Sequence, residues 1–262
     1  MGIAPGRAAV ITGAASGFGL EMARRLIAVD ARVALLDIAS VLDDVAAELG
    51  PAAVPIRCDV RSPVAAAASI RTAAERFGGL DTLIVSAGVI HIKPLAEVTE
   101  EDWDLTLDVN LKGAFLAMQA AAPYIAESGT RGRIVAISSD AGKKGYPSIT
   151  AYTASKFGLV GLVESVAVEL AGYGVTVNAV CPSGAPSTGM GQDVLAWKVA
   201  ATGKSADQVE ADAARALPLA RNATVDDVAA AIEFLISDGA AYVTGSTIDV
   251  DGGARLGYLP GT

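Results

Sequence analysis

The sequence contains few side chains that bind metal ions. Among its 262 residues there is one histidine, His91, and there are two cysteines, Cys58 and Cys181. A zinc site with several sulfur or imidazole ligands is therefore excluded, because the ligands are too few. We expect no metal, and we interpret both cysteines as small, buried apolar residues.

The sequence also lacks basic clusters, long apolar runs and an amino-terminal targeting signal. Its 20 basic and 29 acidic residues give a net charge of −9, which favours neither nucleic acid nor an anionic membrane as a partner. Apolar stretches such as 157–163 are far shorter than the ~20 residues of a membrane-spanning helix. We therefore expect a cytoplasmic protein that binds neither nucleic acid nor membranes.

Length and composition fit one large α/β domain over residues 1–262. Hydrophobic residues make up 52% of the chain, and such domains reach ~250 residues without dividing. Short apolar strands alternate with helical patterns, which predicts a doubly wound parallel sheet. Strands are expected at 8–11, 32–36, 54–60, 82–85, 133–137, 175–180 and 246–250. Helices are expected at 20–28, 65–77, 99–126, 152–171 and 226–235.

The first predicted strand leads into a glycine-rich turn followed by a helix. Glycines allow a tight turn and close backbone approach, and the amides at the start of the helix can bind a pyrophosphate. The spacing is G-x-x-x-G-x-G, and a glycine turn alone is often only a turn. The predicted contacts of a dinucleotide here are Gly13, Ser16, Gly17, Phe18 and Gly19.

Asp37 ends the second predicted strand, 18 residues after Gly19. A carboxylate at this place can accept hydrogen bonds from a ribose and repel a 2′-phosphate, which favours NAD over NADP. Ser16 and Ile38 supply no cation at the two neighbouring positions where an arginine would hold that phosphate. The alternative is that Asp37 only solvates the end of a strand.

Two later strands end in further candidate contacts of the dinucleotide. They are Asp59-Val60 after the third strand and Ser86-Ala87-Gly88 after the fourth. Ligands of doubly wound sheets lie beyond the carboxyl ends of the strands, where all these residues are expected to gather. Asp59 is a candidate for the adenine amino group, and capping of the next helix is the alternative.

Tyr152 and Lys156 are four residues apart and would share one face of a helix. An ammonium beside a phenol can supply the shift of about 3 units by which a tyrosine pKa, ordinarily ~10, must fall to act as a base at neutral pH. Ser139 follows the fifth strand, 13 residues before Tyr152. Asn110 is polar within an apolar stretch, where a structural hydrogen bond is the default and a water-holding catalytic role the alternative.

Taken together, these motifs resemble those of the short-chain dehydrogenase/reductase family over nearly the whole chain. The resemblance implies a Rossmann-type fold and a nicotinamide dinucleotide bound at the glycine turn. The matching residues are Thr12-Gly13-x-x-x-Gly17-x-Gly19, Asp59, Ala87-Gly88, Asn110, Ser139, Tyr152-x-x-x-Lys156, Asn178, Pro182 and Asp251-Gly252-Gly253.

The resemblance also implies a role for each member of a catalytic tetrad. Tyr152 would exchange a proton with an alcohol or ketone as general acid/base, and Ser139 would hold the same substrate oxygen. Lys156 would bind the nicotinamide ribose and lower the tyrosine pKa. Asn110 would anchor a water that carries the proton outward.

The chain departs from the family pattern at two places. Ser86 stands where the family usually has asparagine. In the 182–188 segment, either Ser183 replaces the usual glycine and Ser187 the usual threonine, or one residue is inserted and Thr188 keeps its role. The candidate contacts of the nicotinamide in this segment are Pro182, Gly184, Ala185, Ser187 and Thr188.

These observations predict an NAD-dependent oxidoreductase that interconverts a secondary alcohol and its ketone. Residues 189–217 are helical in pattern and are interpreted as a mobile substrate lid. Apolar helices near 110–126 and 152–171 predict a homotetramer or homodimer. The alternatives are a non-catalytic NAD(H)-binding sensor and a dehydratase or epimerase on the same scaffold, because a fold does not fix its chemistry.

Overall fold

The computed structural model describes residues 3–256, and within them seven parallel strands form one sheet in the order β3-β2-β1-β4-β5-β6-β7. This confirms the predicted doubly wound fold. The strand order reverses between β1 and β4, where sheets of this kind bind their ligands. The strands are β1 (Ala8–Thr12), β2 (Arg32–Asp37), β3 (Ala53–Arg57), β4 (Thr82–Val85), β5 (Arg133–Ile137), β6 (Thr176–Pro182) and β7 (Thr247–Val250).

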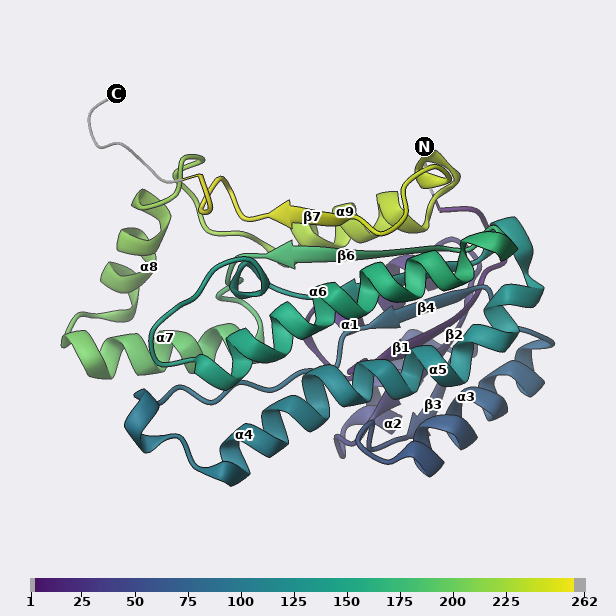
Figure 1. Ribbon diagram of the computed structural model, residues 1–262, viewed down its shortest axis with the longest axis horizontal. Coiled ribbons are helices and arrows are strands. Elements are labelled where there is room, and N and C mark those ends of the chain that lie inside the picture. Colours follow the sequence, from purple (N-terminus) through teal and green to yellow (C-terminus); the bar gives the residue numbers. More distant parts are fainter. Residues whose placement is uncertain (1–2, 257–262) are drawn as a thin grey trace.

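Helices cover both faces of the sheet, and α7 and α8 stand beyond the carboxyl ends of β6 and β7 (Figure 1). A single π-helical turn, Asp108–Lys112, joins α4 to α5. Within residues 3–256, the helices are all too short or too polar to cross a membrane. The helices are α1 (Gly17–Ile27), α2 (Leu42–Leu49), α3 (Pro63–Phe77), α4 (Glu100–Leu107), α5 (Gly113–Glu127), α6 (Thr150–Leu170), α7 (Gly189–Thr202), α8 (Ala206–Arg215) and α9 (Val225–Ile236).

The structure differs from the sequence prediction in two places around β3, a helix that was not predicted and a strand that was predicted too long. The helix α2 was not predicted, because the residue before it, Val41, provides no side-chain cap and therefore no start signal. The strand predicted at 54–60 ends at Arg57, and residues 58–60 already belong to the turn that precedes α3. Asp59 and Val60 consequently lie in a loop beyond the end of the strand.

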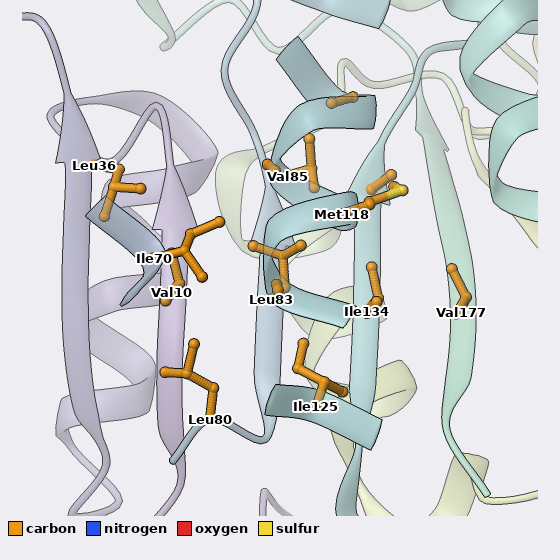
Figure 2. Packing of buried hydrophobic residues seen from close by; sticks show 14 of the residues in the cluster. Val10, Leu36, Ile70, Leu80, Leu83, Val85, Met118, Ile125, Ile134 and Val177 are labelled. Atoms are coloured by element: carbon orange, nitrogen blue, oxygen red, sulfur yellow. The ribbon is translucent and has the colours of Figure 1, made fainter. Parts of the chain in front are cut away.

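The core consists of two layers, one on each face of the sheet. Successive residues of a strand enter opposite layers, which explains why these strands are apolar without alternation. In β5, for example, Ile134 belongs to the layer under α3, α5 and α6, and Val135 to the layer under α1 and α9. Figure 2 shows the first layer, in which Met118 and Ile125 of α5 lie near Leu83 and Ile134 of the strands.

Helix α6 is buried on one side only in the single chain. Leu159 and Val163 lie in the core, whereas Phe157 and Val168 are 47% and 80% exposed. The apolar pattern of this helix therefore has two causes, core packing on one face and an uncovered apolar surface on the other.

A buried polar network fixes the amino-terminal edge of the sheet. The guanidinium of Arg7 is fully buried and donates to Asp81 Oδ1 at 3.1 Å and to the hydroxyl of Thr82 at 3.0 Å. Its other terminal nitrogen donates to the carbonyl of Ile236 at 2.6 Å. The network therefore joins β1, β4 and the end of α9 at the edge opposite the carboxyl ends of the strands.

Candidate active site

The glycine turn after β1 packs directly against the segment that follows β4. Gly13 has φ = +67°, and a Cβ built on it would lie 2.7 Å from Ala87 Cα. A Cβ on Gly19 would lie 2.3 Å from the carbonyl oxygen of Gly13. Only glycine fits at these two positions, so the turn needs its glycines for shape as well as for space around a ligand.

The start of α1 has the properties of an anion-binding site. Ser16 is the N-cap residue, yet its side chain makes no capping hydrogen bond, and the first turn contains no acidic residue. The amides of the first turn therefore keep the partial positive charge that a pyrophosphate can use. The predicted contacts Gly17, Phe18 and Gly19 all lie in this turn, so the residues present fit a dinucleotide.

The carboxylate of Asp37 is held at the other side of the glycine turn. Its Oδ2 accepts the amide of Ala15 at 3.0 Å, and its Oδ1 accepts the amide of Ala39 at 3.0 Å. These contacts fix the carboxylate beside the glycine turn, which is the place where a dinucleotide's ribose is bound in folds of this kind. Asp37 thus does more than solvate the end of a strand.

The sequence prediction missed a cation beside Asp37. Arg57 is the cross-strand partner of Asp37 in the β2–β3 pair. Its guanidinium donates to the carbonyls of Ile38 at 3.0 Å and Ser40 at 3.2 Å, and its side chain is 51% exposed. The loop that follows Asp37 therefore has an arginine beside it, Arg57. The sequence prediction considered only positions 16 and 38, which hold serine and isoleucine.

Asp59 does not cap α3, because that role belongs to Ser62, whose side chain accepts the amide of Ala65. The Asp59 carboxylate instead binds Arg61, with Nη2–Oδ2 and Nε–Oδ1 distances of 2.7 and 3.0 Å. This hydrogen bonding lowers the pKa of Asp59. The neighbouring Val60 packs against the start of α5, where a Cβ on Gly113 would approach it to 2.8 Å.

The segment after β4 is held from both sides. The hydroxyl of Thr12 accepts the amides of Ser86 and Ala87 at 3.2 and 3.3 Å. A Cβ on Gly88 would lie 3.4 Å from Asn110 Oδ1 and 3.8 Å from Lys156 Nζ. The predicted contacts after β4 therefore lie between the glycine turn and the tetrad.

Asn110 lies in the π-helical turn, and both donors of its side-chain amide are used by the protein. Its Oδ1 accepts the amide of Val89 at 2.8 Å, and its Nδ2 donates to the carbonyl of Val89 at 2.9 Å and to Ser155 Oγ at 3.0 Å. Both amide protons are thereby satisfied. The geometry supports the structural interpretation of the Asn110 side chain.

Ser139, Tyr152 and Lys156 meet at the carboxyl end of β5. The side chains of Tyr152 and Ser139 are neighbours, and interaction with Ser139 partly offsets the rise that burial causes in the pKa of Tyr152. Lys156 Nζ donates to the carbonyl of Ile137 at 2.8 Å and lies 5.5 Å from the centroid of the Tyr152 ring. The spacing in the sequence therefore does bring three members of the predicted tetrad together.

Burial is the main cause of the pKa shifts of Tyr152 and Lys156. It raises the pKa of Tyr152 to about 12 and lowers the pKa of Lys156 to about 8. The lowering of the tyrosine pKa expected from Lys156 is not found here, because burial disfavours both charged forms. A tyrosinate at neutral pH therefore needs positive charge beyond that of Lys156.

The 182–188 segment places Thr188, and not Ser187, against the glycine turn. Thr188 is the N-cap of α7, where its hydroxyl accepts the amide of Gly191 at 3.0 Å. A Cβ on Gly17 would lie 3.8 Å from Thr188 Cγ2. This geometry favours the register with one inserted residue. Pro182 is the last residue of β6. Gly184, Ala185 and Ser187 lie in the loop between β6 and α7, and of these three residues Ala185 is buried.

The predicted lid, residues 189–217, consists of the two helices α7 and α8. The helix α7 has no buried residue, and α8 buries only Val209. Among the residues described, no group of three or more histidine, cysteine, aspartate or glutamate side chains could hold a metal ion.

The parallel sheet, the glycine turn at its switch point and the buried Ser139–Tyr152–Lys156 group together define a short-chain dehydrogenase/reductase. The family model described as enoyl-(acyl carrier protein) reductase matches residues 13–255. The chain belongs to the short-chain dehydrogenase/reductase family.

Individual relatives agree with this assignment. D-threitol dehydrogenase of Mycolicibacterium smegmatis is 38% identical over 256 residues, covering 96% of this chain and 94% of the relative. L-2,3-butanediol dehydrogenase of Corynebacterium glutamicum is 35% identical over 253 residues, covering 94% of this chain and 98% of the relative. A crystal structure of an actinorhodin polyketide ketoreductase variant with NADPH has a TM-score of 0.89 at 34% identity, covering 95% of this chain and 97% of that one.

Proposed function

We propose that the protein is an NAD-dependent oxidoreductase that interconverts a secondary alcohol and its ketone. The observation that carries the proposal is the position of Lys156 Nζ, 5.5 Å from the centroid of the Tyr152 ring and bonded to the carbonyl of Ile137 at the end of β5, the strand that Ser139 follows. The two curated relatives named above are dehydrogenases of compounds that carry secondary hydroxyls.

The residues of the chain would bind and orient both reactants. The bound dinucleotide supplies the hydride acceptor or donor. Tyr152 takes the hydroxyl proton of the alcohol, or returns a proton to the ketone oxygen, while Ser139 contacts the same oxygen. Lys156, next to the tyrosine ring, contributes positive charge and a hydrogen bond toward the ribose. Asn110 maintains the π-helical turn and the backbone of Val89 around this group.

The dinucleotide would be held at the edge of the sheet by backbone amides and small side chains. The start of α1 binds the pyrophosphate, Asp37 the adenosine ribose, and Thr188 closes over the turn at Gly17. The preference for NAD rests on the negative charge of Asp37. Arg57 supports a residual affinity for NADP, because its exposed guanidinium lies beside the same loop.

The proposed assembly is a homotetramer or homodimer formed through α5 and α6. Phe115 on α5 and Phe157 on α6 are 43% and 47% exposed. Aromatic rings in an uncovered apolar face are typical of subunit contacts.

The experiment that tests the proposed function is a steady-state assay on a panel of secondary alcohols with NAD and with NADP, comparing the wild type with Tyr152→Phe. We expect turnover by the wild type and a loss of about 10²- to 10⁴-fold in the variant, with NADH binding retained. Unchanged turnover in the variant would show that Tyr152 is not the acid/base. Binding of NADH without turnover across the panel would favour the sensor.

A further inference from the structure

Lys156 is anchored to the end of β5 at two points. Its ammonium donates to the carbonyl of Ile137 at 2.8 Å, and its backbone carbonyl accepts the hydroxyl of Ser138 at 3.1 Å. Ile137 is the last residue of β5 and Ser138 follows it directly. One short segment of the chain therefore holds both the side chain and the backbone of the lysine.

Ser138 is itself fixed by the sheet. Its amide donates to the carbonyl of Val180 on β6 at 2.8 Å, which continues the pairing of β5 with β6 one residue beyond Ile137. The residue is 2% exposed, so water competes little for its hydroxyl. Its hydrogen bond to Lys156 consequently ties α6 to two strands.

The 3₁₀ turn Asp140–Gly142 passes close to α6 at the same point. A Cβ on Gly142 would lie 2.5 Å from Ser138 Oγ and 2.8 Å from the carbonyl oxygen of Lys156. A larger residue would have to displace one of the two partners of this hydrogen bond. The glycine thus leaves the space in which the hydrogen bond forms.

Burial gives the ammonium of Lys156 a tendency to leave its position. Lys156 is 4% exposed, and burial lowers its pKa to about 8, so the charged form is disfavoured where it lies. A lysine side chain is flexible and can carry its ammonium toward water. The hydrogen bond to Ile137 opposes this movement only while the backbone of Lys156, from which the side chain starts, stays in place.

We propose that Ser138 is a positioning residue for the reaction, whose hydroxyl holds the backbone of Lys156 against β5 and thereby keeps the ammonium beside the ring of Tyr152. The effect on turnover rests on the proposed function, whereas the anchoring of Lys156 does not. Lys156 Nζ lies 5.5 Å from the centroid of the ring. At an effective dielectric of ~20, moving the ammonium about 1–2 Å farther away would raise the pKa of Tyr152 by about 0.3–0.6.

Three variants separate this role from a contribution to stability alone. Ser138→Ala removes the donor, and Ser138→Cys keeps a side chain at the position that donates only weakly. Ser237→Ala is the matched control, because Ser237 is 1% exposed and its hydroxyl donates to another helix carbonyl, that of Phe234 at 2.7 Å. We expect Ser138→Ala and Ser237→Ala to lose similar stability in urea, so the distinction comes from two other measurements.

The titration of Lys156 is the first measurement, because it needs neither a dinucleotide nor turnover. Urea midpoints between pH 8 and pH 10.5 are compared between each protein and the same protein with Lys156→Met. The titration of other groups, including the neighbouring Tyr152 and Cys181, cancels in this difference. We expect the difference to change with pH in the wild type and equally in Ser237→Ala.

In Ser138→Ala the released ammonium reaches water and its pKa returns toward 10.5, so the change of this difference with pH falls to about half or less. The same or a smaller effect is expected in Ser138→Cys, which decides alone if Ser138→Ala does not fold. A Lys156 titration equal to that of the wild type in every Ser138 variant that folds would overturn the proposal.

Turnover is the second measurement, and it shows whether the position of Lys156 matters to the reaction. Tyrosinate is the form that accepts the proton of an alcohol, so kcat for oxidation falls at low pH, and a higher pKa of Tyr152 moves this fall to higher pH. We expect the acid limb of Ser138→Ala to lie about 0.3–0.6 pH units above that of the wild type, with kcat below the limb reduced about 2- to 4-fold. Ser237→Ala should show the wild-type profile. An unchanged profile in Ser138→Ala would overturn the positioning role.

The two measurements keep this inference separate from the proposed function. No turnover by the wild type on the alcohol panel, together with a reduced Lys156 titration in Ser138→Ala, would contradict the proposed function and still support the anchoring of Lys156. Turnover by the wild type with an unchanged Lys156 titration in Ser138→Ala would leave the dehydrogenase intact and overturn the role of Ser138.

Discussion

A pair of hydrogen bonds joins the side chain of Asn110 to the backbone of Val89. Asn110 Oδ1 accepts the amide of Val89, and Asn110 Nδ2 donates to its carbonyl. The asparagine thereby replaces the strand partner that the backbone loses after β4. The π-helical turn is the local distortion that brings the side chain to this position.

Asn110→Ala is expected to lower the free energy of unfolding by about 2–4 kcal/mol, because it removes the hydrogen-bond partner of the Val89 amide and carbonyl and a donor to the buried hydroxyl of Ser155. Urea denaturation at neutral pH measures the change. Asn222→Ala is the control, since its side chain makes one hydrogen bond at a partly buried site, and we expect it to cost below about 1 kcal/mol. Equal losses in the two variants would contradict the structural role of Asn110.

Gly13→Ala is expected to lose about 2–4 kcal/mol of stability, from the positive φ and from overlap with Ala87. Gly78→Ala is a matched control, because Gly78 has φ = +73° and free space around a built Cβ. We expect that control to lose about 1 kcal/mol. Denaturation curves and NADH titrations of both variants test this, and loss of NADH binding is expected for Gly13→Ala alone.

The pH dependence of stability tests the burial of Lys156. Its pKa in the folded chain is about 8, below the ordinary 10.5, so the unfolded chain binds the proton more tightly between these values. The free energy of unfolding must therefore rise with pH between about pH 8 and pH 10.5. The cost of burying the charged Lys156 ammonium is fully present below pH 8. Lys156→Met removes the penalty, so we expect it to be more stable than the wild type by about 1–3 kcal/mol at pH 7.

The difference in free energy of unfolding between Lys156→Met and the wild type should shrink as the pH rises from 8 toward 10.5. Turnover by Lys156→Met should be lost at every pH. Denaturation at several pH values measures the trend. Lys112→Met, which replaces an exposed lysine paired with Asp108, should show no such trend. A difference in the free energy of unfolding between Lys156→Met and the wild type that does not change with pH would contradict the lowered pKa of Lys156.

The proposed preference for NAD over NADP depends on two side chains at the end of the β2–β3 pair, Asp37 and Arg57. Asp37→Asn keeps the shape and removes the charge that repels a 2′-phosphate, so the kcat/KM ratio of NADP to NAD is expected to rise about tenfold or more. Adding Arg57→Ala should reverse most of that gain. If the double variant uses NADP as well as Asp37→Asn does, Arg57 has no part in cofactor binding.

Phe157→Glu is expected to reduce the mass of the assembly measured by light scattering, because it places a charge in the apolar face of α5 and α6. Val64→Glu, on α3 and 77% exposed in the wild type, should leave the mass unchanged. A monomeric wild type would contradict the predicted oligomer directly.

Local sequence patterns identified the sheet, the glycine turn and the group formed by Ser139, Tyr152 and Lys156, because each depends on short-range spacing. Features that depend on tertiary contacts were missed. Arg57 reaches the loop after Asp37 only through the register of two strands, and Asp140 meets Tyr146 only through the path of a loop. The pKa of Tyr152 was expected to be low because spacing reveals a neighbouring charge but not the burial around it.

The Arg7 network and the candidate active site lie at opposite edges of one sheet. The polar contacts that fix β1, β4 and α9 are therefore physically separate from α7, α8 and the loop that carries Tyr146. Randomised libraries confined to residues 143–149 and 189–217 would leave Arg7 and its partners untouched. The protein is accordingly suited to directed evolution of substrate range, with the stability of the scaffold and the shape of the pocket varied independently.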